Sequence, residues 1–397
     1  RVSAWFDNMF LHFMLNFYEN GDLMNKQFDL RDHLKKLIAD SPLSQNEIAN
    51  HLGISSSYIS KFLNNKQEIA FWMLHKLVTY LDKDNELFLM SHFCESMKRK
   101  ENLRVGLEYA HSKHLKSLTQ KLIKVCSNDK NEANKEWAYV YEWQLMSKKN
   151  VFYSEEDYLK NLKGLKTKTN EMNALLTILE MYCFFFNEKY ELALYYVNQA
   201  KNLLKDVSDP FVKSSFTARL NEALCYIYLK LENNVCKARE TAFELVDLNL
   251  GPNYLITGYF ILGLSYIKES LTKTEFYYKK VLEISDQTGR TALITDTKEQ
   301  LYLARLYWKK EIDLDWFTNQ FFEAYTYKKS LDKFYDNPRY LPYILLFEGI
   351  AEKNKEKLFM SREYFLKQKD KFRASIPKFE LEKLGLKFKK IKGGEYV

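Results

Sequence analysis

The sequence predicts an all-α protein, and the scarcity of glycine and proline is the first observation behind this prediction. Of 397 residues, 12 are glycine and 6 are proline, well below the averages of about 7% and about 5%. Hairpin turns need glycine, so a chain with 28 tyrosines and 28 phenylalanines but few glycines is poorly suited to a sandwich or barrel. Apolar residues recur at helical spacing, and the 46% of residues that are hydrophobic suffice for buried cores.

The first predicted helix lies before residue 25 and has one apolar face. Its apolar residues recur at steps of three and one along the chain: Phe6, Met9, Phe10, Phe13, Met14 and Phe17. Its other positions include Asp7, His12 and Glu19 rather than the lysines and arginines of a membrane-surface helix. We expect this helix to pack against the rest of the protein, with contact to a partner or to lipid as the alternative.

Four short helices are predicted next, at residues 30–38, 45–52, 56–63 and 71–81, and their close spacing indicates a small compact domain. The most informative pattern within them is LSQNEIANHLGISSSYISKFLNNKQEI, residues 43–69. Ser44 and Glu47 are spaced as a capping box, Gly53 stands where a tight turn needs unhindered backbone, and Ser55 can cap the following helix. The buried faces would consist of Ile48, Ala49 and Leu52, then Ile59, Phe62 and Leu63. Two short helices joined by such a turn form a helix-turn-helix unit.

The second helix of this unit is a candidate for DNA recognition, since its N-terminal part enters the major groove in helix-turn-helix proteins. Eight polar residues on or beside it could contact DNA: Gln45, Ser56, Ser57, Tyr58, Ser60, Lys61, Asn65 and Lys66. Serine and glutamine can bond base edges or phosphates, while lysine neutralises phosphate charge. We predict binding to double-stranded DNA; a helical hairpin that never touches DNA is the alternative. The run Lys98-Arg99-Lys100 is interpreted as a solvated helix face rather than a phosphate contact.

From about residue 104 onward, longer helices follow one another with short polar breaks at residues 128–131, 209–210, 251–252 and 337–338. Small and aromatic residues stand near the spacings of a tetratricopeptide (TPR) helix pair, which needs small side chains where its helices approach. The sets are Gly349, Ser361 and Phe365; Leu262, Gly263 and Tyr266 with Thr274 and Tyr278; Ala193, Val197 and Ala200; and Ala238, Ala242 and Leu245. We therefore predict a helix-turn-helix domain over residues 1–92, followed over 93–397 by a superhelical array of degenerate TPR-like helix pairs. A non-repeating helical array is the alternative.

The residue types needed for catalysis or metal binding are sparse. All seven histidines lie within the first 114 residues, and the five cysteines contain no Cys-x-x-Cys pair. His111 and His114 could share a helix face, but without further ligands they are interpreted as surface residues. Phosphate-loop and nucleophile-elbow motifs are absent from the sequence. We expect neither an enzyme nor a cofactor or metal site, with a hydrolase using scattered carboxylates as a remote alternative.

Cysteine usage and hydropathy indicate a cytoplasmic protein. The odd number of cysteines indicates no disulfide framework and suits a reducing compartment. The longest apolar stretch, residues 255–267, is shorter than the roughly 18 to 20 residues that span a bilayer. We therefore predict no membrane association. The net charge of +8 permits nucleic-acid contact without demanding it.

A stack of helix pairs offers a long concave surface suited to an extended peptide. Asparagine side chains can donate to and accept from peptide backbone at once, which makes Asn221 and Asn253 candidates for peptide binding. Asp370 with Phe372 could supply a carboxylate and an apolar wall. Each asparagine could equally be an ordinary helix cap or surface residue.

The sequence resembles the AimR family, the arbitrium receptors of temperate phages. The match is carried by five short blocks: residues 107–110 (LEYA), 165–173 (LKTKTNEMN), Gly263 with Ser265-Tyr266, Tyr364-Phe365, and 370–385 (DKFRASIPKFELEKLG). They extend from about residue 104 to the end of the chain. The resemblance implies a homodimeric transcription regulator that controls the lysis–lysogeny decision in the cytoplasm of the bacterial host. It would bind operator DNA near its own gene until a short imported signalling peptide, of about six residues, inhibits it.

The resemblance also implies roles for particular residues. In the family, the aspartate and phenylalanine that match Asp370 and Phe372 help to hold the peptide. This chain departs from its relatives at two positions, with Tyr226 where they place an asparagine and Asn253 where they place an arginine. We expect both residues to line the peptide site and to alter which peptide it accepts. The alternative function is a peptide-sensing module that acts on a protein partner rather than on DNA.

Overall fold

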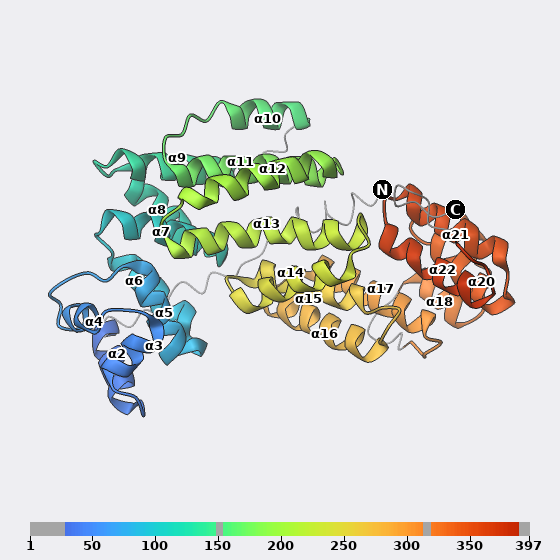
Figure 1. Ribbon diagram of the computed structural model, residues 1–397, viewed down its shortest axis with the longest axis horizontal. Helices are drawn as coiled ribbons and strands as arrows, with labels where there is room; N and C mark the ends of the chain where they lie inside the picture. The colour runs from blue at the N-terminus through green and yellow to red at the C-terminus, as the bar shows by residue number, and fades with distance from the viewer. Residues whose placement is uncertain (1–27, 148–153, 313–318, 389–397) are drawn as a thin grey trace. The chain divides into compact units, whose positions relative to one another are not determined.

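The computed structural model describes residues 28–147, 154–312 and 319–388. Within these ranges every regular element is a helix, and the structure shows no strand there (Figure 1). The all-α prediction is therefore confirmed. The helix expected before residue 25 lies outside the described residues.

The described residues form two compact units. The N-terminal unit comprises the described residues up to Cys183 together with Tyr195–Thr217. The C-terminal unit comprises Phe184–Leu194 together with the described residues from Ala218 onward. The predicted domain boundary at residue 92 falls inside the helix Glu86–Ser96 and stays a prediction.

The N-terminal unit begins with short helices and continues with longer ones. In chain order they are α2 (Leu30–Asp40), α3 (Gln45–Leu52), α4 (Ser56–Leu63), α5 (Phe71–Leu81), α6 (Glu86–Ser96), α7 (Lys100–Ser112), α8 (Lys116–Ser127), α9 (Glu132–Ser147) and α10 (Glu155–Lys163). Three further helices contribute residues to both units: α11 (Asn170–Phe186), α12 (Tyr190–Leu203) and α13 (Pro210–Lys230). Helix α13 starts as its sequence predicts, because the Asp209 carboxylate accepts hydrogen bonds from the amides of Phe211 and Val212 at 2.9 and 3.0 Å.

The two helices of the predicted helix-turn-helix unit, α3 and α4, begin and end at the expected residues. The capping box is present: the Ser44 amide donates to Glu47 Oε2 at 2.8 Å, and the Glu47 amide donates to Ser44 Oγ at 3.3 Å. Gly53 ends α3 with φ of 64°, a left-handed conformation in which a side chain is strained. The predicted cap at Ser55 is wrong, because its side chain makes no capping hydrogen bond to α4.

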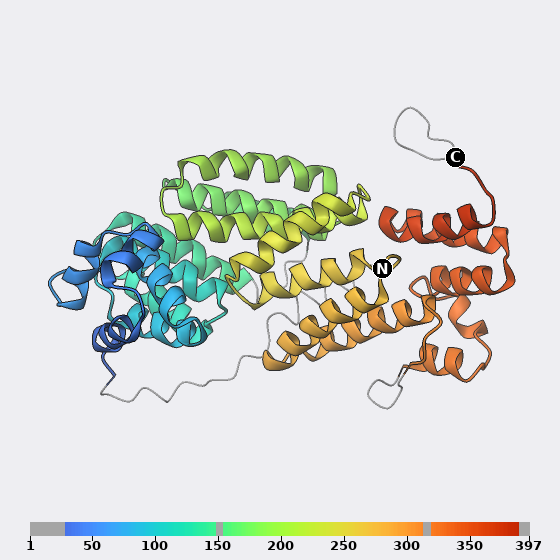
Figure 2. The same ribbon diagram turned by 60° about the horizontal axis from the view of Figure 1, so that its bottom comes forward.

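The C-terminal unit consists of helices that pack against their neighbours in the chain, as the views of Figures 1 and 2 show for α14 to α17. Its helices are α14 (Val235–Leu248), α15 (Pro252–Ser265), α16 (Leu271–Gln287), α17 (Thr291–Tyr307), α18 (Gln320–Thr326), α19 (Asp332–Tyr335), α20 (Leu341–Glu352), α21 (Lys355–Lys367) and α22 (Lys371–Lys383). The breaks between them include the predicted ones at residues 251–252 and 337–338.

Small residues stand where paired helices approach, as the TPR-like pattern predicts. A Cβ atom at Gly263 in α15 would lie 2.8 Å from the ring of Tyr278 in α16. A Cβ atom at Gly349 in α20 would lie 2.7 Å from Leu358 Cγ in α21. Tyr278 and Leu358 are fully buried, so neither can move aside. The close packing of these pairs therefore depends on glycine at both positions.

All five cysteines lie in the described part of the chain and none forms a disulfide. Cys94, Cys126, Cys183 and Cys225 are buried, and Cys236 is exposed. Burial raises the pKa of the Cys126 thiol to about 12, and Asp129 adds to the shift. Among the described helices, none combines the length and apolar character needed to cross a membrane.

Candidate DNA interface and peptide site

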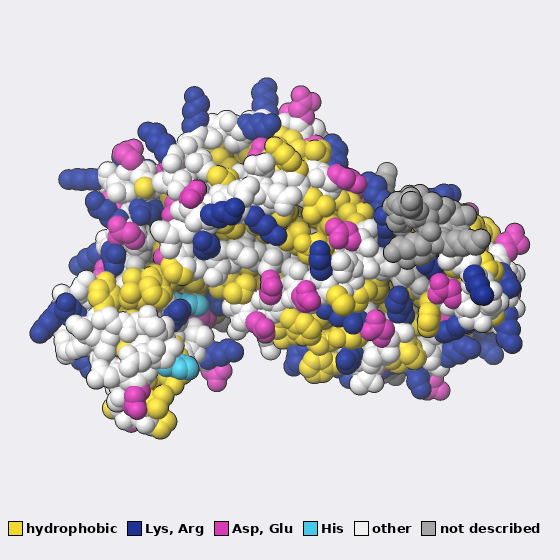
Figure 3. Space-filling view, in the orientation of Figure 1, with side chains coloured by type: hydrophobic (Ala, Val, Ile, Leu, Met, Phe, Trp, Pro, Cys, Tyr) yellow, Lys and Arg dark blue, Asp and Glu magenta, His cyan; other side chains and the backbone are white. Residues whose placement is uncertain are grey.

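The candidate DNA-reading surface is the outward face of α4 and the residues that follow it. Ser57 and Lys61 are exposed on the helix, and Asn65 and Lys66 are exposed just beyond its end. Asn65 has φ of 55°, so the chain turns sharply there. Lysine and arginine side chains are scattered over the visible face in Figure 3 rather than gathered into one patch. Lys61 is therefore a candidate for phosphate contact because of its position on α4, not because it belongs to a broad basic patch.

Three other candidates are less accessible than the sequence indicated. Ser56 and Ser60, expected to be exposed, are half-buried. Gln45 Nε2 donates to the carbonyl and to Oγ of Ser56, each at 3.1 Å, and Ser56 Oγ donates to Asn46. Gln45 and Ser56 are therefore bonded to each other, because α3 and α4 pack against one another. Any role of these side chains in reading DNA stays a prediction.

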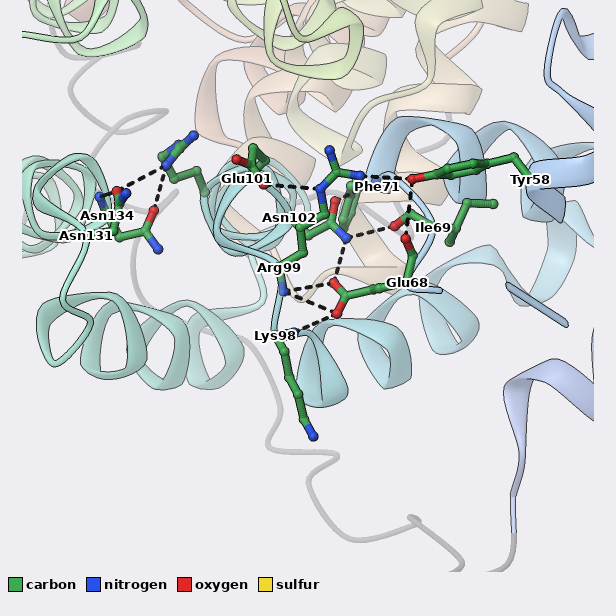
Figure 4. Close-up of polar contacts among 11 residues, drawn as sticks. Tyr58, Glu68, Ile69, Phe71, Lys98, Arg99, Glu101, Asn102, Asn131 and Asn134 are labelled. Carbon is green, nitrogen blue, oxygen red and sulfur yellow. Dashed lines mark hydrogen bonds and ion pairs between the residues drawn. The ribbon is translucent and has the colours of Figure 1, made fainter. Parts of the chain in front are cut away.

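Tyr58 turns its hydroxyl toward the protein rather than toward solvent (Figure 4). Arg99 Nη1 donates to Tyr58 Oη at 3.0 Å, and Tyr58 Oη lies 3.4 Å from the carbonyl oxygen of Glu68, to which it donates. Lys98, Arg99 and Lys100 are all exposed, but the predicted helix face is wrong because Lys98 and Arg99 lie in the break between α6 and α7. Arg99 also contacts α4 through Tyr58. The basic run is thus attached to the candidate recognition helix.

The candidate peptide site is built on one face of α13. Arg219, Glu222, Tyr226 and Lys230 recur there at helical spacing, so their side chains share a face. Lys230 Nζ donates to Tyr226 Oη at 2.6 Å and lies 3.2 Å from Asp370 Oδ2, so two predicted residues, Tyr226 and Asp370, meet through this lysine.

Asp370 is held by two cations. Its Oδ2 lies 2.6 Å from Arg373 Nη1 as well as 3.2 Å from Lys230 Nζ. Its Oδ1 accepts from the Arg373 amide at 2.9 Å and caps α22. Burial alone would raise the pKa of the Asp370 carboxyl, but the charges of Lys230 and Arg373 outweigh burial and lower that pKa. Arg373 Nη2 donates to Gln300 Oε1 at 2.7 Å and ties α22 to α17.

Tyr226 and Phe372 complete the apolar side of this cluster. The Tyr226 ring packs edge-on against Phe185 with centroids 5.4 Å apart, and Lys230 Nζ lies 4.7 Å from its centroid. Burial and the charge of Asp370 raise the pKa of Tyr226, which keeps the hydroxyl protonated. Phe372 is 0% exposed, and Lys268 Nζ lies 5.8 Å from its ring centroid. Phe372 therefore lies in the core rather than forming an open wall.

Asn221 and Asn253 belong to a different part of the unit. Asn221 is buried and its Nδ2 donates to Glu244 Oε2 at 2.9 Å. Asn253, the second residue of α15, has a buried Oδ1 for which no hydrogen-bond partner is found among the described residues. One turn further on, Thr257 Oγ1 donates to Glu222 Oε1 at 3.3 Å. The structure does not bring either asparagine into contact with Asp370.

Several polar residues of these clusters were missed by the sequence argument. Lys230 and Arg373 pair with Asp370, Gln300 accepts from Arg373, and Glu222 accepts from Thr257. Burial lowers the pKa of Arg290 to about 10, although the nearby charge of Glu222 opposes the shift. The signal that could have found Lys230 and Glu222 is the stripe of polar and aromatic residues at helical spacing along α13.

In the part of the chain that the structure describes, no group of histidine, cysteine, aspartate or glutamate side chains is arranged to hold a metal ion. The structure instead presents two separate candidate sites: the exposed face of α4 in the N-terminal unit, and a buried charge cluster among the TPR-like helices of the C-terminal unit. That combination defines the class of helical-repeat transcription regulators.

The chain belongs to the family of AimR transcriptional regulator-like proteins, whose family model matches residues 86–383. The family is one of transcription regulators and not of enzymes. The AimR transcriptional regulator of Bacillus phage SPbeta is 25% identical over 381 residues, which cover 90% of this chain and 96% of the relative. The AimR transcriptional regulator of Bacillus phage phi3T is 24% identical over 347 residues, covering 82% and 89%.

Two solved structures share the fold. The structure of SeMet-phAimR superposes with a TM-score of 0.64 at 21% identity, covering 90% of this chain and 98% of that one. The structure of phAimR-Ligand superposes with a TM-score of 0.59 at 22% identity, covering 80% and 98%.

Proposed function

We propose that this phage-type transcription regulator binds operator DNA as a homodimer through α4 and is inhibited by a short imported signalling peptide. It would act in the cytoplasm of the bacterial host and bias the choice between lysis and lysogeny. The observation that carries the DNA-binding part is the helix pair α3 and α4, capped by Ser44 and Glu47, turned at Gly53 and displaying Ser57 and Lys61.

The peptide-binding part is supported by the charge cluster on α13 and by the relative whose structure is described with a ligand. The buried Lys230–Asp370 pair, with the partly buried Arg373 beside it, is costly to keep, since its charges must be desolvated. A charged group of a peptide could replace one of these three side chains in its ion pair and so move α13 relative to α22. Because half-sites on DNA are separated by whole helical turns, such a movement would alter the spacing of the two recognition helices.

The test is fluorescence anisotropy of the purified protein on duplexes from immediately upstream and downstream of its own gene. Each titration is repeated with synthetic peptides taken from the C-terminus of any small adjoining reading frame. We expect specific binding that the peptide reverses. Specific binding that ignores every peptide would contradict the inhibitory signal. A lack of specific binding at moderate salt would shift the function to the alternative, a peptide sensor that acts on a protein partner.

Lys61 provides a sharper test of the interface. A lysine that neutralises one phosphate contributes about one unit to the slope of log K against log salt. We expect Lys61→Ala to weaken binding to all sequences and to lower this slope by about one. The matched control is Lys130→Ala, which removes an exposed lysine of the loop between α8 and α9. A Lys61→Ala slope equal to that of the control would remove the phosphate contact from the proposal.

A further inference from the structure

Helices α5 and α7 of the N-terminal unit are among those whose N-cap residue supplies no capping side chain. The residue before α5 is Ala70 and the residue before α7 is Arg99, and neither makes a side-chain capping hydrogen bond. The first amides of a helix need partners when they are shielded from water. At both helices the partner comes from the other segment of the chain.

Glu68, in the loop between α4 and α5, binds the backbone that leads into α7, which begins at Lys100. Its carboxylate accepts from the Lys98 amide at 3.0 Å and from the Arg99 amide at 3.1 and 3.2 Å (Figure 4). Asn102, in the first turn of α7, caps α5 in return, because its Oδ1 accepts from the Phe71 amide at 2.8 Å. A negative carboxylate at the start of a helix is also favoured by the helix dipole.

Glu68 and Asn102 also bond to each other, and together they form what we call the reciprocal clasp. Asn102 Nδ2 donates to Glu68 Oε1 at 2.7 Å and to the Ile69 carbonyl at 2.8 Å. Asn102 is 1% exposed, and both ends of its amide are bonded. Each polar group of the clasp therefore has a hydrogen-bond partner. Such a fully bonded group stabilises the contact and fixes its geometry.

The clasp is linked to α4 by two hydrogen bonds of the Tyr58 hydroxyl group. Arg99, whose amide bonds Glu68, donates through Nη1 to Tyr58 Oη, and Tyr58 Oη donates to the carbonyl of Glu68. Beneath this layer Phe71 packs against Phe93 and Tyr109 with centroids 6.1 and 5.4 Å apart. The aromatic layer supplies non-directional burial, whereas the hydrogen bonds fix the angle at which the segments meet.

We propose that Glu68 and Asn102 are positioning residues for DNA recognition, which hold α4 at a fixed orientation to α7 and hence to the helices that follow it. This inference rests on the proposed DNA-binding function. In a dimer that binds two half-sites, a wrong orientation of α4 lowers the affinity for DNA only when both recognition helices must dock at once. The clasp should therefore matter for a complete operator and not for half of one.

The test uses Glu68→Gln, which keeps the size of the side chain but places an amide donor against the amides that the carboxylate now accepts. The matched control is Glu132→Gln in the same unit, where the side chain is 84% exposed. Both variants and the unaltered protein are titrated by anisotropy on the shortest duplex that the unaltered protein protects, and on the same duplex cut to one half-site. Thermal melts by circular dichroism verify that each variant is folded.

We expect Glu68→Gln to bind the complete duplex about tenfold more weakly, the effect of losing one charge-assisted hydrogen bond. Its affinity for the half-site, its salt slope and the behaviour of Glu132→Gln should be unchanged. Equal affinity of Glu68→Gln and the unaltered protein for the complete duplex would overturn the inference. So would a parallel loss on both duplexes, since that is the mark of a direct contact or of lost stability.

Tyr58→Phe serves as the second variant, because it cuts the link to α4 while leaving the side-chain bonds of Glu68 and Asn102 in place. It should show the same loss on the complete duplex alone, and it keeps the inference testable if Glu68→Gln fails to fold. Failure of the unaltered protein to bind any duplex would instead overturn the proposed function, and the clasp's role with it.

Discussion

At the scale of single residues, Asp370 is the position where a sequence-based role and the structure differ most. The sequence suggested a carboxylate offered to a cationic group of a peptide, whereas the structure gives it two cations of its own, Lys230 and Arg373. The pairing with Lys230 is long-range in sequence, so no local pattern could reveal it, whereas Arg373 stands only three residues after Asp370. Replacing Asp370 with alanine would remove a helix cap as well as a charge, and asparagine separates the two effects.

We expect Asp370→Asn to lower the free energy of unfolding by about 3 kcal/mol at neutral pH, because Lys230 is left as an uncompensated buried cation and Arg373 loses its carboxylate partner. Urea unfolding followed by circular dichroism measures this. Asp286→Asn, at an exposed position of α16, is the control and should change little. If the two variants were equally stable, the buried ion pairs would contribute nothing.

Glu86 provides a pH-dependent counterpart in the N-terminal unit. Burial would raise the pKa of its carboxyl, but His75 and Lys113, whose nitrogens lie 3.2 and 3.0 Å from its oxygens, lower that pKa from 4.5 to about 2. Between these values the unfolded chain binds more protons than the folded one, so stability falls as the pH falls. The shift corresponds to roughly 3 kcal/mol of stability at neutral pH.

We therefore expect the difference in unfolding free energy between the unaltered protein and Glu86→Gln to be largest above about pH 5 and to shrink toward pH 2. Urea titrations at several pH values measure the difference. A gap that stays constant over this range would show that Glu86 stabilises the fold by packing rather than by its charge.

At the scale of helices, prediction succeeded where the determinants are local. The bounds of α3, α4 and α5 follow from a capping box, a glycine turn and apolar spacing, all of which are written within a few residues. The reciprocal clasp was not predictable in this way. Ala70 and Arg99 supply no side-chain cap, and the hydrogen bonds found at the starts of their helices come from Asn102 and Glu68 in another segment.

The helix pairs give a prediction about packing. The atoms nearest to a methyl group at Gly263 belong to the ring of Tyr278, at 2.8 Å, so Gly263→Ala should cost about 1–3 kcal/mol of stability by overpacking. Tyr278→Leu makes room for that methyl group. In a double-mutant cycle measured by urea unfolding, we expect the alanine to cost less in the Tyr278→Leu background. Strictly additive effects would mean that the methyl group added at Gly263 does not clash with the Tyr278 ring.

At the scale of the whole molecule, the class of protein could be predicted from the sequence, but the pairing of distant side chains could not. Composition and small-residue spacing indicated the all-helical fold and the paired helices. The residues predicted to bind a peptide fall into two places: Tyr226 lies near Asp370, and Asn221 contacts Glu244. Their spacing in the sequence does not reveal this grouping, because it depends on how the helices pack. Linkage between a peptide site and a DNA site is a property of the folded molecule.

Linkage sets a quantitative expectation. If a peptide lowers the affinity for DNA by some factor, DNA must lower the affinity for that peptide by the same factor. Isothermal titration of the peptide into free protein and into DNA-saturated protein measures the second factor, and anisotropy measures the first. A peptide that binds equally well to both forms would contradict its role as the inhibitory signal.

The distribution of the cysteines makes such measurements practical. Four thiols are enclosed by the fold and Cys236, at the start of α14, is open to reagents. Since only an accessible thiolate reacts at a useful rate, a maleimide dye should attach at Cys236 and leave the others untouched. The native chain thus carries its own labelling site, from which energy transfer between two dyed copies can follow assembly and peptide response without any engineered cysteine.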